Sequence, residues 1–201
     1  MRRYLAELGL KKLRPKSQRK PAVAVSSVRA LPPGRRVQID ATRFALSDGM
    51  AWKHVVLDAG SRACLAVQTV RALTKEAAAT ALQAAKSVLN ELGIGEPLVV
   101  QSDAGSDFTS AHFQNTCTAL GGSWHRCRVN ETGGMGILER ANRTLKWDFV
   151  FWQEPTTIAE LTALDAAFKR WYNHERMHSA IGYRTPWQKL QEDATLALAL
   201  G

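Results

Sequence analysis

The sequence predicts an α/β fold in which helices flank a mixed five-stranded sheet. Three strand-like segments joined by short turns come first, at residues 36–40, 51–58 and 64–70, and strands connected in this way are antiparallel neighbours. Two further strand-like segments, at residues 98–100 and 123–129, then alternate with helical patterns. Strands reached through helical crossovers run parallel to a neighbour, so the two halves together predict a mixed sheet.

The first strand shows its two faces in its residue pattern. Val37 and Ile39 lie on one face, and Gln38 and Asp40 lie on the other, because side chains alternate along a strand. The pair Asp48-Gly49 is typical of a hairpin turn and predicts that the second strand folds back on the first. The sequence therefore predicts that the first strand has one polar face, which carries the Asp40 carboxylate.

Two of the predicted helices carry capping signals at their start. Thr74 precedes an apolar stripe that ends at Gly93, and Thr157 with Glu160 forms a capping box for the last long helix. Between them the sequence predicts a short helix over residues 110–120 and then a long helix. The apolar stripe of that long helix consists of Leu138, Ala141, Leu145, Phe149 and Trp152. The buried face of the last helix consists of Leu161, Leu164, Phe168, Trp171 and Tyr172.

The net charge of +9 is concentrated at the N-terminus. Residues 1–20 hold eight Lys and Arg side chains against Glu7 alone, a net charge of +7, which leaves +2 for the other 181 residues. A basic arm on a nearly neutral body indicates contact with nucleic acid, or less often with a membrane surface, and we expect Lys11, Lys12 and Arg14 to bind DNA phosphates. The alternative is a solvated charged end that binds nothing.

The number of cysteines and the lack of long apolar segments indicate the cellular compartment of the protein. The three cysteines are odd in number and lack short-range pairing, which argues against a disulfide framework. We find neither an apolar run long enough for a membrane helix nor the apolar stretch of a signal peptide. We therefore expect a cytoplasmic protein with a basic arm at residues 1–33, a core at 34–190 and a tail at 191–201.

Three carboxylates lie at the ends or edges of the predicted elements. Asp40 is on the first strand, Asp103 follows the fourth strand, and Glu139 opens the long helix with 35 residues separating it from Asp103. The spacing alone is weak, because 18 acids in 201 residues produce such offsets by chance. Asp103 could also be a turn former, since Gly105 follows closely.

The surroundings of these acids make the pattern specific. Asp103 lies in the segment 102–110, Glu139 opens the segment 139–146, and a third motif spans residues 172–186. With these three motifs in order, residues 34–190 or so resemble the integrase-core transposases of bacterial insertion sequences, which are relatives of retroviral integrases. The resemblance implies a ribonuclease-H-like fold, which agrees with the order of strands and helices above.

The resemblance also implies an activity and a cofactor. Asp40, Asp103 and Glu139 would hold Mg²⁺ or Mn²⁺, two ions in all, and carboxylate oxygens suit such hard cations. Two ions can activate an attacking oxygen and stabilise a leaving one. The implied reactions are cleavage at DNA 3′ ends and strand transfer, with transposon ends and target DNA as substrates. We expect a homo-oligomer on DNA, associated with the bacterial nucleoid.

Basic side chains share the predicted helix with Glu139. Arg143 and Lys146 come four and seven residues later, on the same helical face, and we expect them to contact DNA phosphates. Ordinary pairing with acids on the helix surface is the alternative. Asn142 could contact DNA or face solvent.

Some features depart from the family pattern. Ala104 and Met177 replace residues that the family commonly has, and residues 130–136 lack its usual run before the glutamate. Only about thirty residues precede the core, where the family carries a helix-turn-helix, so we expect the second half of a two-frame transposase, with an upstream-frame partner protein, or a truncated remnant. The alternatives to a transposase are an inactive DNA-binding remnant and a nuclease that only cleaves.

Overall fold

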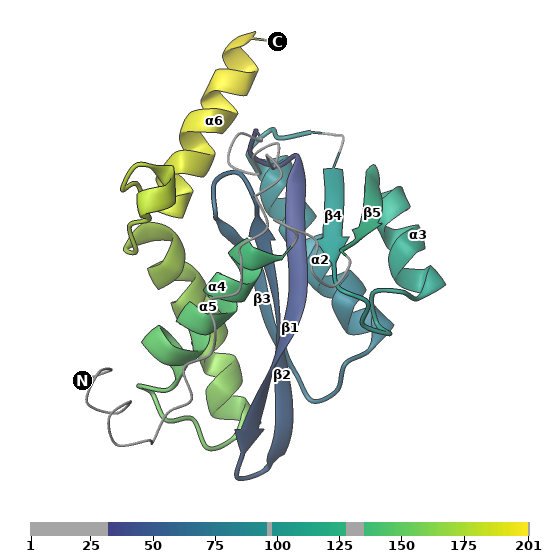
Figure 1. Ribbon diagram of the computed structural model, residues 1–201, viewed down its shortest axis with the longest axis vertical. Coiled ribbons are helices and arrows are strands. Elements are labelled where there is room, and N and C mark those ends of the chain that lie inside the picture. The colour runs from purple at the N-terminus through teal and green to yellow at the C-terminus, as the bar shows by residue number, and fades with distance from the viewer. Residues whose placement is uncertain (1–31, 96–97, 128–134, 201) are drawn as a thin grey trace, which may run out of the picture.

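A mixed five-stranded sheet, in the order β3-β2-β1-β4-β5, forms the centre of the protein (Figure 1). The computed structural model describes residues 32–95, 98–127 and 135–200. β1 pairs with β2 in antiparallel fashion and with β4 in parallel, so the predicted mixed sheet is confirmed. The strands are β1 (Arg36–Leu46), β2 (Gly49–Asp58), β3 (Cys64–Val70), β4 (Leu98–Ser102) and β5 (Gly122–Arg126).

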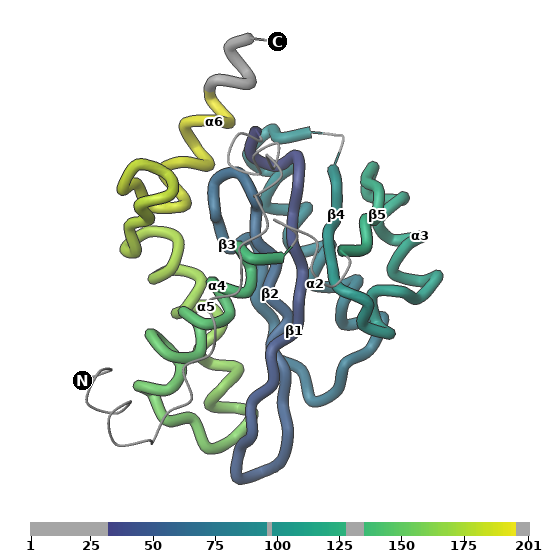
Figure 2. Tube along the Cα trace, viewed as in Figure 1, coloured from purple at the N-terminus to yellow at the C-terminus, as the bar shows by residue number. Residues whose placement is uncertain are grey.

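β1 is longer than its sequence pattern indicated. Its pairing with β2 runs from Val37 opposite Asp58 to Leu46 opposite Gly49, so the hairpin continues well past Asp40. Figure 2 shows this hairpin extending beyond the ends of β4 and β5. Pairing with β2 explains the extension of β1 beyond Asp40. Hydrogen bonds to a neighbouring strand stabilise extended residues whose own sequence pattern does not predict a strand.

The helices cover both faces of the sheet. α4 and α5 lie on one side, and α2 lies on the other with α3 beside it (Figure 1). The elements are α2 (Lys75–Glu91), α3 (Ala111–Ala119), α4 (Gly136–Thr144), the π-helical segment η2 (Leu145–Val150), α5 (Ile158–His174), the 3₁₀ turn η3 (Ser179–Ile181) and α6 (Pro186–Leu200). Thr74 caps α2 and the capping box of Thr157 and Glu160 starts α5, so both predicted caps are confirmed.

Alternation along β1 supplies two hydrophobic cores. Val37 and Ile39 pack with α2 and α3 in one cluster, and Phe44 packs with α4 and α5 in the other. Each face of β1 is thus covered by helices, as the period-two pattern requires. Cys64, Cys117 and Cys127 are buried and are not joined in disulfides, in agreement with the expectation from the cysteine count.

The predicted long helix after Leu138 is not one regular helix. α4 ends at Thr144 and the chain continues as η2, where the N–H of Phe151 bonds to the carbonyl of Lys146 at 2.9 Å. A π-helical turn holds more residues than an α-turn, so the helical stripe is shifted beyond this point. Trp152, predicted to be in the core, is 80% exposed, and that prediction was wrong.

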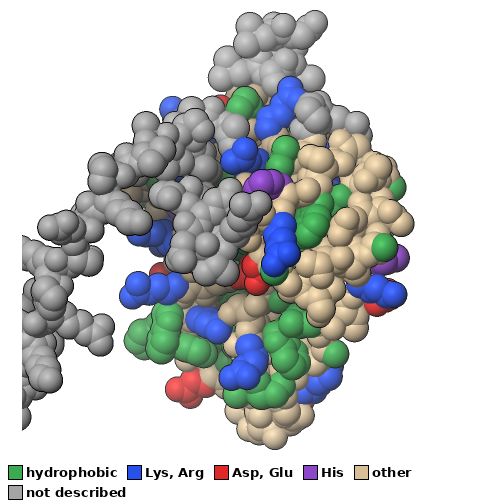
Figure 3. Space-filling model, turned by 45° about the vertical axis from the view of Figure 1, so that its right-hand side comes forward, with side chains coloured by type: hydrophobic (Ala, Val, Ile, Leu, Met, Phe, Trp, Pro, Cys, Tyr) green, Lys and Arg blue, Asp and Glu red, His purple; other side chains and the backbone are tan. Residues whose placement is uncertain are grey.

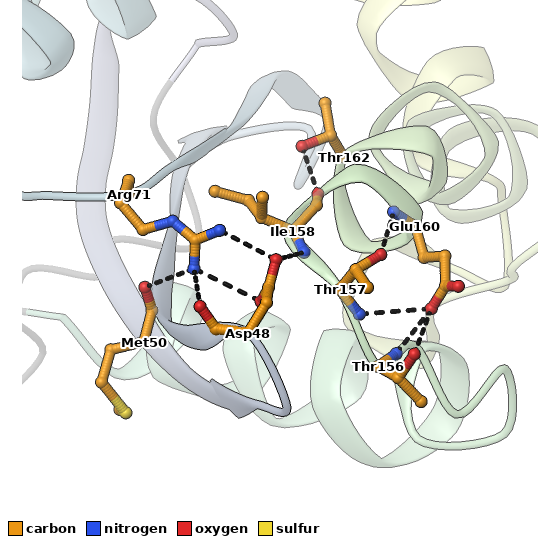
Figure 4. A network of polar contacts seen from close by, with 8 residues as sticks. All are labelled: Asp48, Met50, Arg71, Thr156, Thr157, Ile158, Glu160 and Thr162. Atoms are coloured by element: carbon orange, nitrogen blue, oxygen red, sulfur yellow. Dashed lines mark hydrogen bonds and ion pairs between the residues drawn. The ribbon is translucent and has the colours of Figure 1, made fainter.

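The tip of the β1–β2 hairpin is attached to the start of α5 (Figure 4). The Asp48 carboxylate accepts hydrogen bonds from Arg71 Nη2 at 2.9 Å and from the backbone N–H of Ile158 at 3.0 Å. These bonds, Arg71 first, lower the pKa of Asp48. Behind them, the buried Lys53 ammonium donates to the Leu161 carbonyl at 2.7 Å and pairs with Asp165. The face of the sheet on which α4 lies is therefore firmly supported.

The chain after α5 closes in a tight turn around His178. The His178 N–H donates to the Arg184 carbonyl at 3.0 Å, and Gly182 takes a positive φ of 72°. Arg176 contacts the His178 ring at 3.0 Å and reaches Thr144 on α4. Burial, with Arg176 and two further arginines nearby, lowers the pKa of His178 to about 4.

In the described ranges no helix is long and apolar enough to cross a bilayer.

Candidate functional site

Asp40 is the most enclosed of the three predicted carboxylates. It is half-buried on β1, where Oδ1 accepts a bond from the Ala41 N–H and Oδ2 accepts one from Asn142 Nδ2, each at 2.8 Å. Burial raises the pKa of Asp40 to about 6. The negative charges of Asp103 and Glu139 also raise this pKa, whereas the two hydrogen bonds lower it. Since charge acts on Asp40 from both acids, the fold brings all three to one region.

Asp103 begins the loop that follows β4. Its side chain is exposed, and its Oδ1 accepts a bond from the Gly105 N–H at 2.9 Å, so it does shape a turn. A Cβ atom at Gly105 would lie 2.6 Å from Asp107 Oδ1 and 3.2 Å from Asp103 Oδ1. Any other residue at this position would therefore push against the carboxylate that we expect to be functional.

Glu139 lies in the first turn of α4. Its side chain is exposed, and its backbone N–H bonds to the Met135 carbonyl at 2.9 Å as the helix begins. The negative charge of Glu139 contributes to the raised pKa of Asp40, so the two carboxylates lie near each other. Glu139 thus presents a charged group toward the same region as Asp40.

One buried side chain, Gln38, connects the three elements that carry these acids. Its Nε2 donates to Gln101 Oε1 on β4 at 3.2 Å, and its Oε1 accepts the N–H of Leu138 on α4 at 3.1 Å. Gln38 precedes Asp40 by two residues, Gln101 precedes Asp103 by two, and Leu138 precedes Glu139 by one. We did not predict this role, and the signal that could have indicated it is the shared strand face of Gln38 and Asp40.

The carboxylates are near one another without forming a closed cluster. Across residues 32–95, 98–127 and 135–200, no three His, Cys, Asp or Glu side chains lie close enough together to hold a metal ion as they stand. The donor set nevertheless fits a divalent cation. Asp103 and Glu139 are exposed on a loop and on a first helical turn, whereas Asn142 holds Asp40 in place.

Asn142 supplies a further oxygen next to Asp40. Its Oδ1 is buried and has no hydrogen-bond partner within the described part of the chain. A buried carbonyl oxygen without a donor is costly unless a ligand or water satisfies it. It is therefore suited to a cation or to a water molecule bound there. One of the two expectations for Asn142 was that it faces solvent, and its burial excludes that alternative.

The predicted basic residues lie along the same helix. Arg143 is exposed, and the Lys146 ammonium lies over the Phe44 ring, 5.4 Å from its centroid. Burial and then the positive charge of Arg43 lower the pKa of Lys146, whereas Asp40 raises it. Neither Arg143 nor Lys146 forms a salt bridge with any carboxylate that the structure describes, so the surface pairing considered as the alternative is not formed there. The predicted arm residues Lys11, Lys12 and Arg14 lie outside the described residues.

Comparison with known families shows to which family of proteins this chain belongs. A family model described as "Integrase core domain" matches residues 31–131, and a second model of the same description matches residues 121–186. The chain belongs to the integrase core domain family. A curated relative, the transposase for insertion sequence element IS904 of Lactococcus lactis subsp. lactis (strain IL1403), is 30% identical over 90 residues. That match spans 44% of this chain and 36% of the relative, about a third of its length.

Solved structures of viral integrases share the fold of this integrase core. The simian T-cell lymphotropic virus intasome in complex with PP2A regulatory subunit B56 gamma gives a TM-score of 0.64 at 23% identity, over 81% of this chain and 56% of that one. The HTLV-2 integrase catalytic core domain in complex with magnesium gives 0.59 at 21% identity, over 80% and 98%. The BIV integrase catalytic core gives 0.60 at 22% identity, over 82% and 99%. The predicted ribonuclease-H-like fold is confirmed.

Proposed function

We propose that this integrase core cleaves DNA at 3′ ends and joins those ends to target DNA, using Asp40, Asp103 and Glu139. The observation that carries the proposal is the environment of Asp40, a half-buried carboxylate whose pKa is raised to about 6 by burial and by the two other acids. Acidic side chains that repel one another from neighbouring elements cost stability, and a site for cations explains that cost.

Divalent cations suit the residues at this site. Asp40, Asp103 and Glu139 would hold Mg²⁺ or Mn²⁺, with the unpartnered Asn142 Oδ1 available to a bound water molecule or to an ion. When bound, two such ions supply activation of an attacking oxygen and stabilisation of a leaving one. The magnesium named for the HTLV-2 integrase core supports the choice of ion.

The residues around the carboxylates hold them for this chemistry. The Asn142 amide fixes one oxygen of Asp40, and Gln38 fixes the start of α4 relative to β1 and β4. Arg143 and Lys146 would bind phosphates of the DNA on either side of the reacting one, since both lack a described carboxylate partner.

The proposed reaction proceeds in two displacements at phosphorus without a covalent protein intermediate. Water first attacks at the transposon end and breaks the bond between phosphorus and the 3′ oxygen, which leaves a free 3′-hydroxyl. That hydroxyl then attacks a target phosphate, and a target 3′ oxygen departs. We further propose that the chain acts as a homo-oligomer on DNA in the bacterial nucleoid, with an upstream-frame protein that recognises the ends. The dimeric and trimeric forms of the HTLV-2 core support oligomer formation.

An inactive DNA-binding protein is the second candidate. The observation that favours it is that no three acids of the described residues are close enough to hold an ion as they stand. A nuclease that only cleaves is distinguished from both by its products.

A branched DNA that mimics a strand-transfer product tests the proposal, because its resolution does not depend on the transposon end sequence. With Mg²⁺ or Mn²⁺ the chain should release the branch and join the target strand, and EDTA should prevent both. The variants Asp40→Asn, Asp103→Asn and Glu139→Gln should give no product. Asp148→Asn, which changes an exposed acid just beyond α4, is the matched control and should retain activity.

The products separate the three functions. Release with joining supports the transposase, release without joining supports the nuclease, and retention of DNA binding without any product supports the inactive protein. Activity in any of the three carboxylate variants at the wild-type rate would contradict the proposal.

A further inference from the structure

A group of aromatic side chains next to α4 has no role in the site described above. Phe44 on β1, Trp147 on η2 and Phe151 directly after η2 form this aromatic platform. The Trp147 and Phe151 rings meet edge to face with centroids 4.8 Å apart, and the Phe151 and Phe44 centroids are 6.4 Å apart. Phe44 is only 4% exposed and forms the floor, whereas Trp147 is 61% and Phe151 44% exposed.

The exposure of the platform is not required by the fold. The same segment buries Leu145 and Val150 completely against the core, so η2 already has an apolar side that supports the sheet. Trp147 and Phe151 instead present large rings to solvent on the other side. Adjacent exposed aromatic rings of this size mark a binding surface more often than an accident of packing.

Positive charge lies near the platform. Lys146 lies over the Phe44 ring, and Arg43, also on β1, is close enough to lower the pKa of Lys146. Arg43 is exposed and makes no salt bridge with the acids of the described residues, and Asp148 contributes one negative charge to the same turn. On the face drawn in Figure 3, Lys and Arg side chains lie among hydrophobic ones, and few acidic side chains are visible. The platform therefore suits an anionic ligand that also has flat apolar faces.

The platform is close to the carboxylates. Phe44 and Asp40 lie on the same face of β1, because they are four residues apart in a strand, a separation of about 13 Å. Lys146 lies over the Phe44 ring and also interacts electrostatically with Asp40, so it is near both the rings and the acids. A nucleic acid whose phosphate lies at Asp40 would reach the rings within a few nucleotides.

We propose that the aromatic platform stacks unpaired bases of DNA whose reacting phosphate lies at the carboxylates, with Lys146 on an adjoining phosphate. This inference rests on the proposed function, since it assumes that DNA is bound at Asp40. Bases inside a duplex have both faces covered, and the outermost pair of a blunt end exposes a single face, so unpaired bases offer more surface to a side-chain ring. The platform thus selects DNA ends that are open or easily opened.

Binding of two hairpin DNAs tests the proposal. One probe has a blunt end, and the other has the same sequence with three mismatched terminal positions, so that its last bases are unpaired. Affinities are measured by fluorescence anisotropy in EDTA, where the chemistry cannot proceed. The wild-type chain should bind the open end about tenfold more tightly than the blunt end, the size expected for stacking of one base.

The variants assign that preference to the platform. Trp147→Ala should bring the ratio of the two affinities close to one while the affinity for the blunt probe changes less than twofold. Tyr183→Ala, which removes an exposed aromatic ring from the turn after α5, is the control and should keep the ratio. A 2-aminopurine base at an unpaired position should lose fluorescence on binding the wild-type chain and lose less on binding Trp147→Ala, because stacking quenches it.

The contrary results are distinct. Equal binding of both probes by the wild-type chain, or an unchanged ratio in Trp147→Ala, would overturn the inference and leave the proposed function standing. Binding of neither probe would also overturn the inference, and the branched-DNA assay with metal then decides the proposed function. A shift from dimer to monomer in Trp147→Ala during sedimentation, with an unchanged ratio, would assign the platform to a second copy of the chain and overturn base stacking.

Discussion

Replacing Gln38 with leucine should disorganise the carboxylate site at a distance. Leucine has a similar volume but cannot donate to Gln101 or accept from the Leu138 N–H. The change leaves a buried amide N–H and a buried carbonyl without these partners, because Gln38 is fully buried and Gln101 is 5% exposed. The start of α4, and with it Glu139, would no longer be fixed relative to β1 and β4.

The expected size of the effect follows from these two bonds. Each buried neutral bond contributes about 1 kcal/mol, and an unsatisfied partner adds a penalty, so the free energy of unfolding should fall by about 2–4 kcal/mol. For a domain of this size the midpoint of thermal unfolding should fall by roughly 10 °C. Mn²⁺ affinity should fall by about tenfold or more, as is usual when a group that orients metal ligands is removed.

Asn173 provides a matched control on the far part of the sheet. It is another fully buried amide, and it also makes two bonds between elements, with the Cys64 N–H and the Cys64 carbonyl, both at 2.8 Å. Asn173→Leu should therefore lower stability by a similar amount without changing Mn²⁺ affinity. Stability is measured by thermal unfolding and affinity by titration calorimetry well below the lower midpoint.

The comparison of the two variants decides the matter. If Gln38→Leu and Asn173→Leu weaken Mn²⁺ binding equally, the loss reflects general destabilisation and Gln38 has no positioning role. If Gln38→Leu destabilises the fold but binds Mn²⁺ like the wild-type chain, the reasoning is refuted.

The other expectations concern DNA binding and pH. Changing both Arg143 and Lys146 to Ala should reduce the slope of log affinity against log salt concentration by up to about 0.9 for each phosphate that the variant no longer binds. An unchanged slope in a filter-binding assay would exclude phosphate binding by these side chains. Deleting residues 1–20 should weaken binding to unrelated duplexes alike and leave the fold intact by circular dichroism, whereas selective loss for one DNA sequence would show that the arm reads bases. The pKa of His178 is lowered to about 4, so the unfolded chain binds the extra proton and stability should be lost as pH falls from about 6.5 toward 4. His178→Gln should reduce that loss in urea unfolding at pH 7.5 and 5, and an identical pH dependence would contradict it.

Local signals in the sequence were sufficient for most of the fold. The caps at Thr74 and Thr157 and the alternation of Val37 and Ile39 depend on neighbouring residues alone, and the structure has all of them. The length of β1 could not be read in the same way, because its second half is held by pairing with β2. Trp152 was misplaced because the change from α4 to η2 alters the helical period.

The sequence predicts the acids of the candidate site but not the hydrogen bonds that support them. The order of Asp40, Asp103 and Glu139 follows from motifs along the chain. The bonds of Gln38 join residues 63 and 100 positions apart, and the bond between Asn142 and Asp40 spans 102 positions. Partners that lie so far apart in the chain come together only through the topology of the sheet and helices, so a single sequence carries no local signal for them.

A crystal structure with bound Mn²⁺ shows whether the three carboxylates form one cation site, since Mn²⁺ is located by its anomalous scattering. We expect an anomalous peak in contact with Asp40 and with Asp103 or Glu139, the exposed acids having turned toward Asp40. The Asp40→Asn variant should lack that peak under the same conditions. No peak at saturating Mn²⁺, or a peak bound by other residues while these three carboxylates stay apart, would contradict the account.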